Sequence, residues 1–211
     1  MAPEQLPRLH LITDDEVLRA PHFLDAARTI LAEFGRNIAL HLRGHGLTGA
    51  ELYELASELR PLAEEGGAPL LINDRVDLAL AAGGAGVQLG RRSLPVTPVR
   101  RLLGEERWIG YSAHSVEEVE RVGQEGADFA VYGTIFPSAT HPGEPTAGLG
   151  GLRKVAEVSS LPLIAIGGMR PESVREVRAA GAYGLAVLGA VWHEREPAAA
   201  VARFQREIEE V

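Results

Sequence analysis

The sequence contains no cysteine and only one lysine, Lys154, among its 21 basic residues. The lack of cysteine excludes disulfide bonds, thiolate nucleophiles and cysteine metal sites. Schiff-base catalysis needs a lysine amine, so Lys154 alone could supply it. It lies in the helix-like stretch GLRKVAEV, which is typical of a solvated surface lysine.

Long apolar runs and basic blocks are absent as well. No run approaches the roughly 20 residues of a membrane helix, and the N-terminus lacks the cationic start and apolar run of a signal peptide. The formal net charge is -8, which makes nucleic acid a poor partner. We therefore expect a soluble cytoplasmic protein with neither a membrane nor a nucleic acid as partner. The oligomeric state stays open, and a homodimer is among the states allowed.

Short apolar runs alternate with longer amphipathic segments along the chain. Strands are expected at 9–13, 38–43, 69–73, 86–89, 108–112, 129–133, 162–166 and 184–188. Helices are expected at 23–34, 48–65, 75–82, 96–103, 115–125, 149–158, 171–181 and 197–210. Strict alternation indicates a parallel sheet, and eight βα units predict one compact (β/α)8 TIM barrel over residues 1–211. An open doubly wound sheet is the alternative.

Glycines follow the last two predicted strands, in AIGGM (165–169) and VLGA (187–190). Backbone N–H groups of Gly167, Gly168 and Gly189 can approach an anion closely, and barrels often bind phosphate at these two loops. The alternative is that these glycines only make tight turns. We favour phosphate binding, because both loops of the expected pair carry glycine.

Polar residues end most of the other predicted strands. In LHLRGHG (40–46), His41 and Arg43 share one strand face, which we expect to point to the barrel mouth, and His45 follows. Each histidine could act in acid–base chemistry or be purely structural, and Arg43 suits an anion.

Asn73 and Asp74 end the third predicted strand, where either a helix cap or a ligand contact would explain them. Ser112 ends the fifth and is a candidate ligand contact.

The loop TIFPSATH (134–141) follows the sixth predicted strand and places Ser138, Thr140 and His141 among prolines and glycines. We interpret it as a cover over the reacting groups, with Gly148 behind it as a further substrate contact. The alternative is an ordered cap whose His141 is merely solvated.

Taken together, LITD, HLRGHGLTGAEL, INDRVDLAL, GVQLG, IGYSAHS, ADFAVYGTIFPSATH and PLIAIGGM resemble the thiamine phosphate synthase and TenI superfamily, in the family order. The resemblance covers nearly the whole chain. It implies a (β/α)8 barrel that binds thiazole phosphates.

Two activities are known in that superfamily. The synthases join a pyrimidine diphosphate to a thiazole phosphate and release diphosphate. Their Q-x-R-x-K motif is here His41-Leu42-Arg43-Gly44-His45, and their T-x-T-K motif is Ser138-Ala139-Thr140-His141. Of their two magnesium aspartates, one matches Asp74 and the other falls at Ser93.

TenI-like proteins depart from the synthase pattern in the same places. They are thiazole tautomerases, which aromatise a carboxythiazole phosphate by proton transfer without a metal. Their histidine follows the sixth strand in a G-H-x-F context, whereas Thr134 follows Gly133 here. Another residue of this chain would then have to supply the acid–base group.

We therefore predict a TenI-like thiazole tautomerase of thiamine biosynthesis. His141, His45 and His41 are its acid–base candidates and Arg43 would hold the carboxylate. No cofactor or metal is expected. A thiamine phosphate synthase with Mg²⁺ near Asp74 is the main alternative, and a non-catalytic thiazole-phosphate-binding or regulatory protein is the third.

Overall fold

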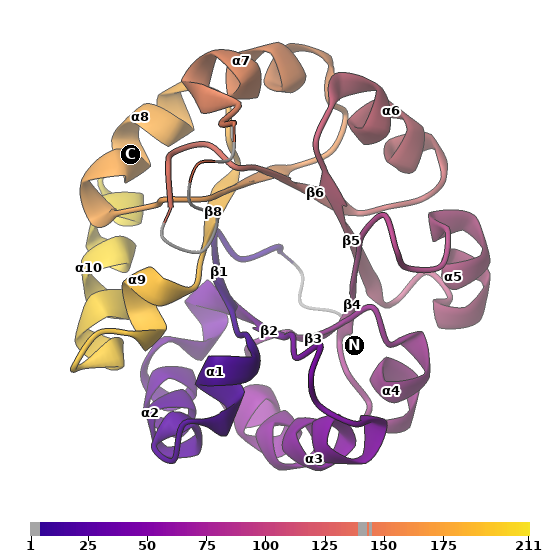
Figure 1. Cartoon of the computed structure of the whole chain (residues 1–211), viewed down its shortest axis with the longest axis vertical. Coiled ribbons are helices and arrows are strands. Elements are labelled where there is room, and N and C mark those ends of the chain that lie inside the picture. Colours follow the sequence, from indigo (N-terminus) through magenta and orange to yellow (C-terminus); the bar gives the residue numbers. More distant parts are fainter. Residues whose placement is uncertain (1–4, 139–142, 144) are drawn as a thin grey trace.

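Eight parallel strands close into a barrel in chain order, because β1 pairs with both β2 and β8 (Figure 1). The structure is a computed structural model that describes residues 5–138, 143 and 145–211. The strands are β1 Leu9–Ile12, β2 Ile38–Leu42, β3 Leu70–Asn73, β4 Gly86–Leu89, β5 Trp108–Ala113, β6 Phe129–Gly133, β7 Leu163–Ile166 and β8 Gly184–Val187. The predicted (β/α)8 architecture is confirmed, and the open sheet is wrong.

Helices surround the barrel as an outer ring (Figure 1). Eight of them lie in the segments predicted from the sequence: α2 Phe23–Phe34, α3 Gly49–Gly66, α4 Val76–Ala81, α5 Val96–Leu103, α6 Val116–Gln124, α7 Gly148–Val158, α8 Val174–Ala179 and α10 Pro197–Glu209. Thr48 and Glu51 form a reciprocal capping box at the start of α3. The caps therefore agree with the helix starts read from the sequence.

Two short helices were not expected: α1 Asp15–Arg19 after β1, and α9 Gly189–Trp192 after β8. Two single turns of 3-10 helix, η1 Gly35–Asn37 and η2 Pro171–Ser173, precede β2 and α8. Segments of four or five residues are too short to show a 3.6-residue apolar period. Both short helices lie at the carboxyl end of the barrel, where the candidate site forms.

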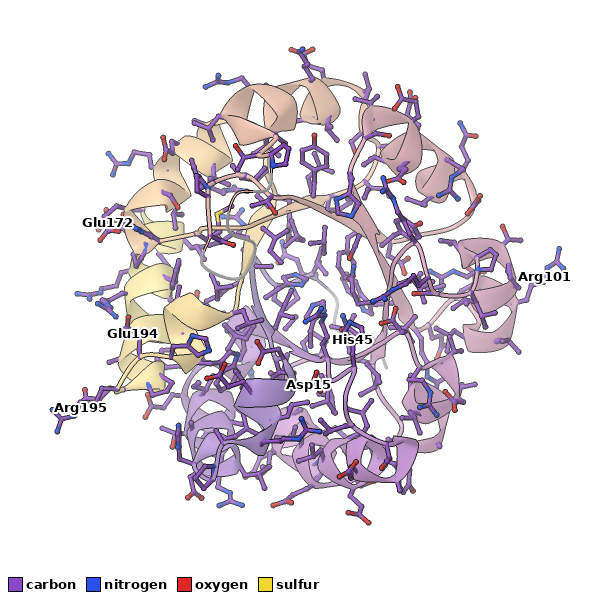
Figure 2. All side chains as sticks on the ribbon, viewed as in Figure 1. Asp15, His45, Arg101, Glu172, Glu194 and Arg195 are labelled. Atoms are coloured by element: carbon purple, nitrogen blue, oxygen red, sulfur yellow. The ribbon has the colours of Figure 1, made fainter. Side chains whose placement is uncertain are left out.

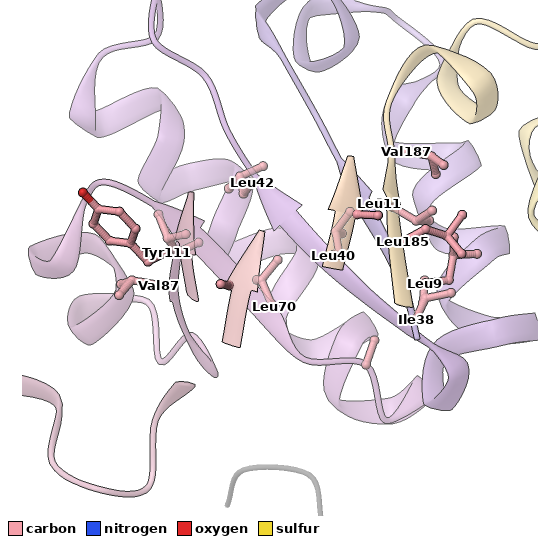
Figure 3. Packing of buried hydrophobic residues seen from close by; sticks show 14 of the residues in the cluster. Leu9, Leu11, Ile38, Leu40, Leu42, Leu70, Val87, Tyr111, Leu185 and Val187 are labelled. Carbon is pink, nitrogen blue, oxygen red and sulfur yellow. The ribbon is translucent and has the colours of Figure 1, made fainter. Parts of the chain in front are cut away.

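The apolar core has two parts. The larger one lies between the strands and the helices, and includes Leu9, Leu11, Leu40 and Leu185 (Figure 3). The smaller one fills the barrel interior with Leu6, Ile12, Ala39, Leu71, Phe129, Val131, Ile164 and Ala186. Gly110 makes room for Phe129, because a Cβ there would lie 2.3 Å from Phe129 Cζ. Polar side chains share this interior, and they are described below.

Arg100 ties together the loops at the amino end of β5 and β6. Its guanidinium donates to the carbonyl oxygens of Gly104, Arg107 and Gly126, and it pairs with Asp128 at 2.5 Å. The Asp128 carboxylate also accepts from Ile109 N at 2.6 Å. One mostly buried side chain therefore satisfies acceptors from both loops.

Replacing Arg100 by alanine is expected to lower the free energy of unfolding by about 1–3 kcal/mol, because several part-buried carbonyl and carboxylate oxygens lose their donor. Urea titration of the purified variant measures the loss. Arg101→Ala is the matched control, since Arg101 is exposed on the same helix and points outward (Figure 2). Equal stability of the two variants would contradict this structural role.

In the part of the chain that the structure describes, no helix combines the length and the apolar character needed to cross a membrane.

Candidate active site

Side chains from three successive loops meet at the carboxyl end of the barrel. His45 follows β2, Asp74 follows β3, and Ser93 lies in the loop after β4. Ser93 Oγ donates to Asp74 Oδ1 and accepts from Gly90 N at 2.8 Å. His45 Nδ1 lies 3.9 Å from Asp74 Oδ2. The structure therefore brings two predicted site residues, His45 and Asp74, together around one carboxylate.

Asp74 has an unusual backbone. Its φ of 62° is in the left-handed region, which non-glycine residues rarely occupy. Its N–H donates to Gln88 O at 2.9 Å, so β4 holds this conformation. Such positions concentrate at functional sites. This supports a ligand-binding role for Asp74 over the helix cap that the sequence left open.

Helix α1 holds the loop that carries His45. Asp15 Oδ1 accepts from Gly46 N at 2.8 Å, and Arg19 donates to Gly46 O at 2.8 Å. Figure 2 places Asp15 and His45 inside the ring of helices, whereas Arg101 and Glu194 lie at its circumference. Sequence reasoning missed this support, because α1 itself was not predicted.

Arg43 follows β2 directly. Its N–H donates to Thr13 Oγ1 at 2.9 Å, and Thr13 Oγ1 lies within hydrogen-bond distance of His41 O and Arg43 O. The guanidinium makes no ion pair with any described residue. It is partly exposed, so it is available to an anionic ligand.

His41 is not at the barrel mouth, and that prediction is wrong. It is 0% exposed and lies inside the barrel, where its Nε2 is 2.8 Å from His10 Nδ1. Strand β2 ends at Leu42, so His41 still lies within the closed part of the barrel. Burial, with the nearby His10 as a smaller cause, lowers the pKa of His41 well below its ordinary value. His10 was not among the predicted site residues, although it alternates with buried leucines in LHLI.

The two buried histidines predict acid sensitivity. Burial lowers the pKa of His10 from 6.5 to about 4, so below pH 6.5 the unfolded chain takes up the proton before the folded protein does. The stabilisation is complete above about pH 6.5 and is lost as the pH falls toward 4. We expect His10 to account for a loss of about 2 kcal/mol between pH 7 and pH 5.

Urea unfolding at the two pH values measures this loss. His10→Phe should remove this part of the pH dependence, whereas the exposed His22→Asn should retain it. A His10→Phe protein with the full pH dependence would contradict the assignment.

Ser112, on β5, is tied to the barrel interior. Gln88 Nε2 donates to its Oγ at 3.0 Å. The next residue but one, His114, lies over β6, with Nδ1 3.2 Å from Gly133 O. Asn73, at the end of β3, has a buried Oδ1 that no described residue hydrogen-bonds. Asn73, Gln88 and Ser112 therefore line neighbouring strands below the rim.

The loop after β7 has the geometry of an anion cradle. Gly167 and Gly168 have φ values of 101° and 63°. Among the described residues, their N–H groups and that of Gly189 donate to no carbonyl. Gly189 is also the first residue of α9. These free donors are what a bound phosphate requires.

The loop after β6 packs on this cradle. Ile135 N donates to Ile166 O at 2.9 Å, and Phe136 N donates to Gly167 O at 3.0 Å. Ser138 is at the end of the described part of this loop, while Thr140 and His141 lie outside the described residues. Gly148 begins α7 with a φ of 62°.

The rim does not fit a two-carboxylate magnesium site. Asp74 is present, but Ser93 supplies a hydroxyl that hydrogen-bonds the same carboxylate. Within residues 5–138, 143 and 145–211, no group of three or more His, Asp or Glu side chains could hold a metal ion. Of the two aspartates in the synthase pattern, only the one at Asp74 is present here. Magnesium sites in proteins use one or two carboxylates together with substrate phosphates.

Comparison with known proteins agrees with this fold. The family described as thiamine monophosphate synthase matches residues 9–191. The thiamine-phosphate synthase of Chlorobium phaeovibrioides is 38% identical over 205 residues, covering 97% of this chain and 95% of the relative. That of Albidiferax ferrireducens is 37% identical and covers 98% of this chain and 94% of the relative.

Among solved structures, the thiamine phosphate pyrophosphorylase of Pyrococcus furiosus has a TM-score of 0.82 and 32% identity, with 96% of each chain covered. A 3-hexulose-6-phosphate synthase, at 16% identity and a TM-score of 0.67, shares the fold alone. The fold thus defines a (β/α)8 barrel. More narrowly, the chain belongs to the thiamine phosphate synthase and TenI superfamily.

Proposed function

We propose that this protein is a thiamine-phosphate synthase, which joins a pyrimidine diphosphate to a thiazole phosphate and releases diphosphate. The observation that carries the proposal is likeness over almost the whole chain to proteins of that name, at 36–38% identity for several of them. This replaces the tautomerase as the leading interpretation, because the sequence departures at Ser93, His45 and His141 are weaker evidence than the relatives.

The geometry gives roles to particular residues. The phosphate of the thiazole substrate would bind the free N–H groups of Gly167, Gly168 and Gly189. Arg43 follows β2, which is separated from β8 by β1 alone. Its guanidinium, which makes no ion pair with a described residue, suits the oxygens of a diphosphate. His45, beside Asp74, stands where the synthase pattern has a lysine. Asn73, Ser112, Ser138 and Gly148 remain proposed substrate contacts, as do Thr140 and His141 beyond the described part of the loop.

A thiazole tautomerase is the second candidate, and one arrangement favours it. Asp74 binds Ser93 and lies beside His45, so a carboxylate–imidazole pair replaces a pair of metal carboxylates. A histidine close to a carboxylate at the mouth of a barrel is a suitable general acid–base. This reaction needs a phosphate site and a proton carrier but no diphosphate leaving group.

A paired assay on the purified protein tests both candidates. One arm supplies thiazole phosphate, pyrimidine diphosphate and Mg²⁺ and follows thiamine phosphate; the other supplies the unaromatised carboxythiazole phosphate and follows aromatisation. We expect thiamine phosphate in the first arm. Aromatisation alone would support the tautomerase, with His45→Ala then expected to abolish it. No turnover in either arm, with thiazole phosphate still bound, would favour a binding protein.

A further inference from the structure

The loop after β4 begins with a tight turn that Ser93 closes at both ends. Ser93 N donates to Gly90 O at 3.0 Å, and Gly90 N donates to Ser93 Oγ at 2.8 Å. A hydroxyl has a single hydrogen, and Ser93 donates it to Asp74 Oδ1. The position of this turn therefore decides how the Ser93 hydroxyl meets the Asp74 carboxylate.

Arg91 lies inside this turn and ties it to helix α6. Its Nε donates to Glu118 Oε1 at 2.8 Å. The other oxygen of that carboxylate, Oε2, accepts from His114 N at 2.7 Å, in the loop after β5. Strands β4 and β5 are adjacent and parallel. One carboxylate therefore joins the loops that follow two neighbouring strands.

Glu118 is the better fixed partner of this ion pair. Its side chain is 20% exposed, against 61% for Arg91, and its N–H donates to Oγ of Ser115, the N-cap of α6. Partial burial raises the pKa of the Glu118 carboxyl, but the hydrogen bonds from Arg91 and His114 N outweigh this, so the pKa lies below its ordinary value. An ion pair with one partner so exposed adds little to global stability, and its main effect is on the turn that Arg91 carries.

We infer that Glu118 is a positioning residue, which holds the turn after β4 through Arg91. In this arrangement the Ser93 hydroxyl occupies Asp74 Oδ1 and leaves Oδ2 available at the rim. His45 Nδ1 lies on that side, 3.9 Å from Oδ2. Without the ion pair the turn can shift, and the carboxylate is no longer held in one orientation. The role in the reaction rests on the proposed function, whereas the path from Glu118 to Asp74 consists of contacts in the structure.

Amide hydrogen exchange at Gly90 and Ser93 tests the ion pair without any substrate. We expect Glu118→Gln and Arg91→Gln to speed exchange at both amides about tenfold, because the turn opens more readily. Glu117→Gln is the control, since Glu117 is the exposed neighbour of Glu118 on the same helix, and it should leave both amides unchanged. Unchanged exchange in Arg91→Gln would overturn the inference.

Kinetics in the active arm of the paired assay separate positioning from direct substrate contact. We expect Glu118→Gln and Arg91→Gln each to lower kcat about tenfold with little change in KM, and the double variant to be no slower than either. Neither substitution should have a further effect in a Ser93→Ala protein, where the turn has no hydroxyl to position. Additive losses would overturn the inference, and so would a rise in KM confined to Arg91→Gln, because Arg91 would then bind substrate itself.

Arg91→Gln also separates the turn from the fold of α6. It leaves the hydrogen bond from His114 N to Glu118 in place, so it tests the inference even where Glu118→Gln unfolds the protein. A wild-type protein that is inactive in both arms would count against the proposed function, whereas the exchange rates at Gly90 and Ser93 decide by themselves whether the ion pair holds the turn.

Discussion

Replacing Ser93 by aspartate is expected to create a divalent-metal site at the rim. The new carboxylate would stand beside Asp74, where the Ser93 hydroxyl now donates to Asp74 Oδ1. Two adjacent carboxylates repel each other until a cation binds between them. We expect the affinity for Mn²⁺, used as a probe for Mg²⁺, to rise at least about tenfold. Mn²⁺ binding followed by electron paramagnetic resonance measures this without any substrate.

Ser93→Asn is the matched control, since it has the size of aspartate without the charge and should not bind Mn²⁺ more tightly than the wild type. If the protein is a synthase limited by its single rim carboxylate, Ser93→Asp should also form thiamine phosphate faster with Mg²⁺ present. Wild-type protein that already binds Mn²⁺ as tightly as Ser93→Asp would show that Asp74 alone suffices, and would contradict the argument.

Replacing Gly168 by alanine is expected to reduce kcat/KM by about a hundredfold or more. The residue has a φ of 63°, and a Cβ there would lie 2.5 Å from Pro137 O and 2.7 Å from Phe136 Cβ. The methyl group would strain the backbone and push apart the loops after β6 and β7. Because both loops border the proposed phosphate site, a shift of about 1 Å is enough for a loss of this size.

Steady-state kinetics in whichever arm of the paired assay is active measures this loss, together with binding of inorganic phosphate. Gly150→Ala is the matched control, because its Cβ would meet no described atom within 4 Å and Gly150 lies inside α7. Helix propensity favours alanine there, so activity should be kept. A Gly168→Ala protein with unchanged phosphate binding would contradict the cradle.

Much of the fold could be read from local patterns. The eight strands and eight of the helices lie where the alternation of apolar and amphipathic runs predicts them. Thr48 and Ser115 are the N-caps of α3 and α6. The short helices α1 and α9 escaped this reasoning. Helix α1 is held by contacts distant in sequence, which are the hydrogen bonds of Asp15 and Arg19 to Gly46. Helix α9 follows directly after β8.

The candidate site divides in the same way. Glycines after β7 and β8, with Asp74 after β3, could be located because parallel strands bring their carboxyl ends to one rim. The depth of His41 could not be read, because alternation along a strand distinguishes inside from outside but not mouth from interior. Its partner His10 lies 31 residues away, a contact that only closure of the barrel creates.

By itself the sequence determined the eightfold alternation, the acidic surface without cysteine, and the identity of the residues at each strand end, since these depend on neighbours in the chain. The tertiary structure decided which of those residues meet. It brought the Ser93 hydroxyl into a hydrogen bond with the Asp74 carboxylate, placed His45 3.9 Å from that carboxylate, and buried His41 beside His10. Such pairings depend on strand register and barrel closure, which are set by packing over the whole molecule. The apolar pattern of a single segment therefore does not predict them.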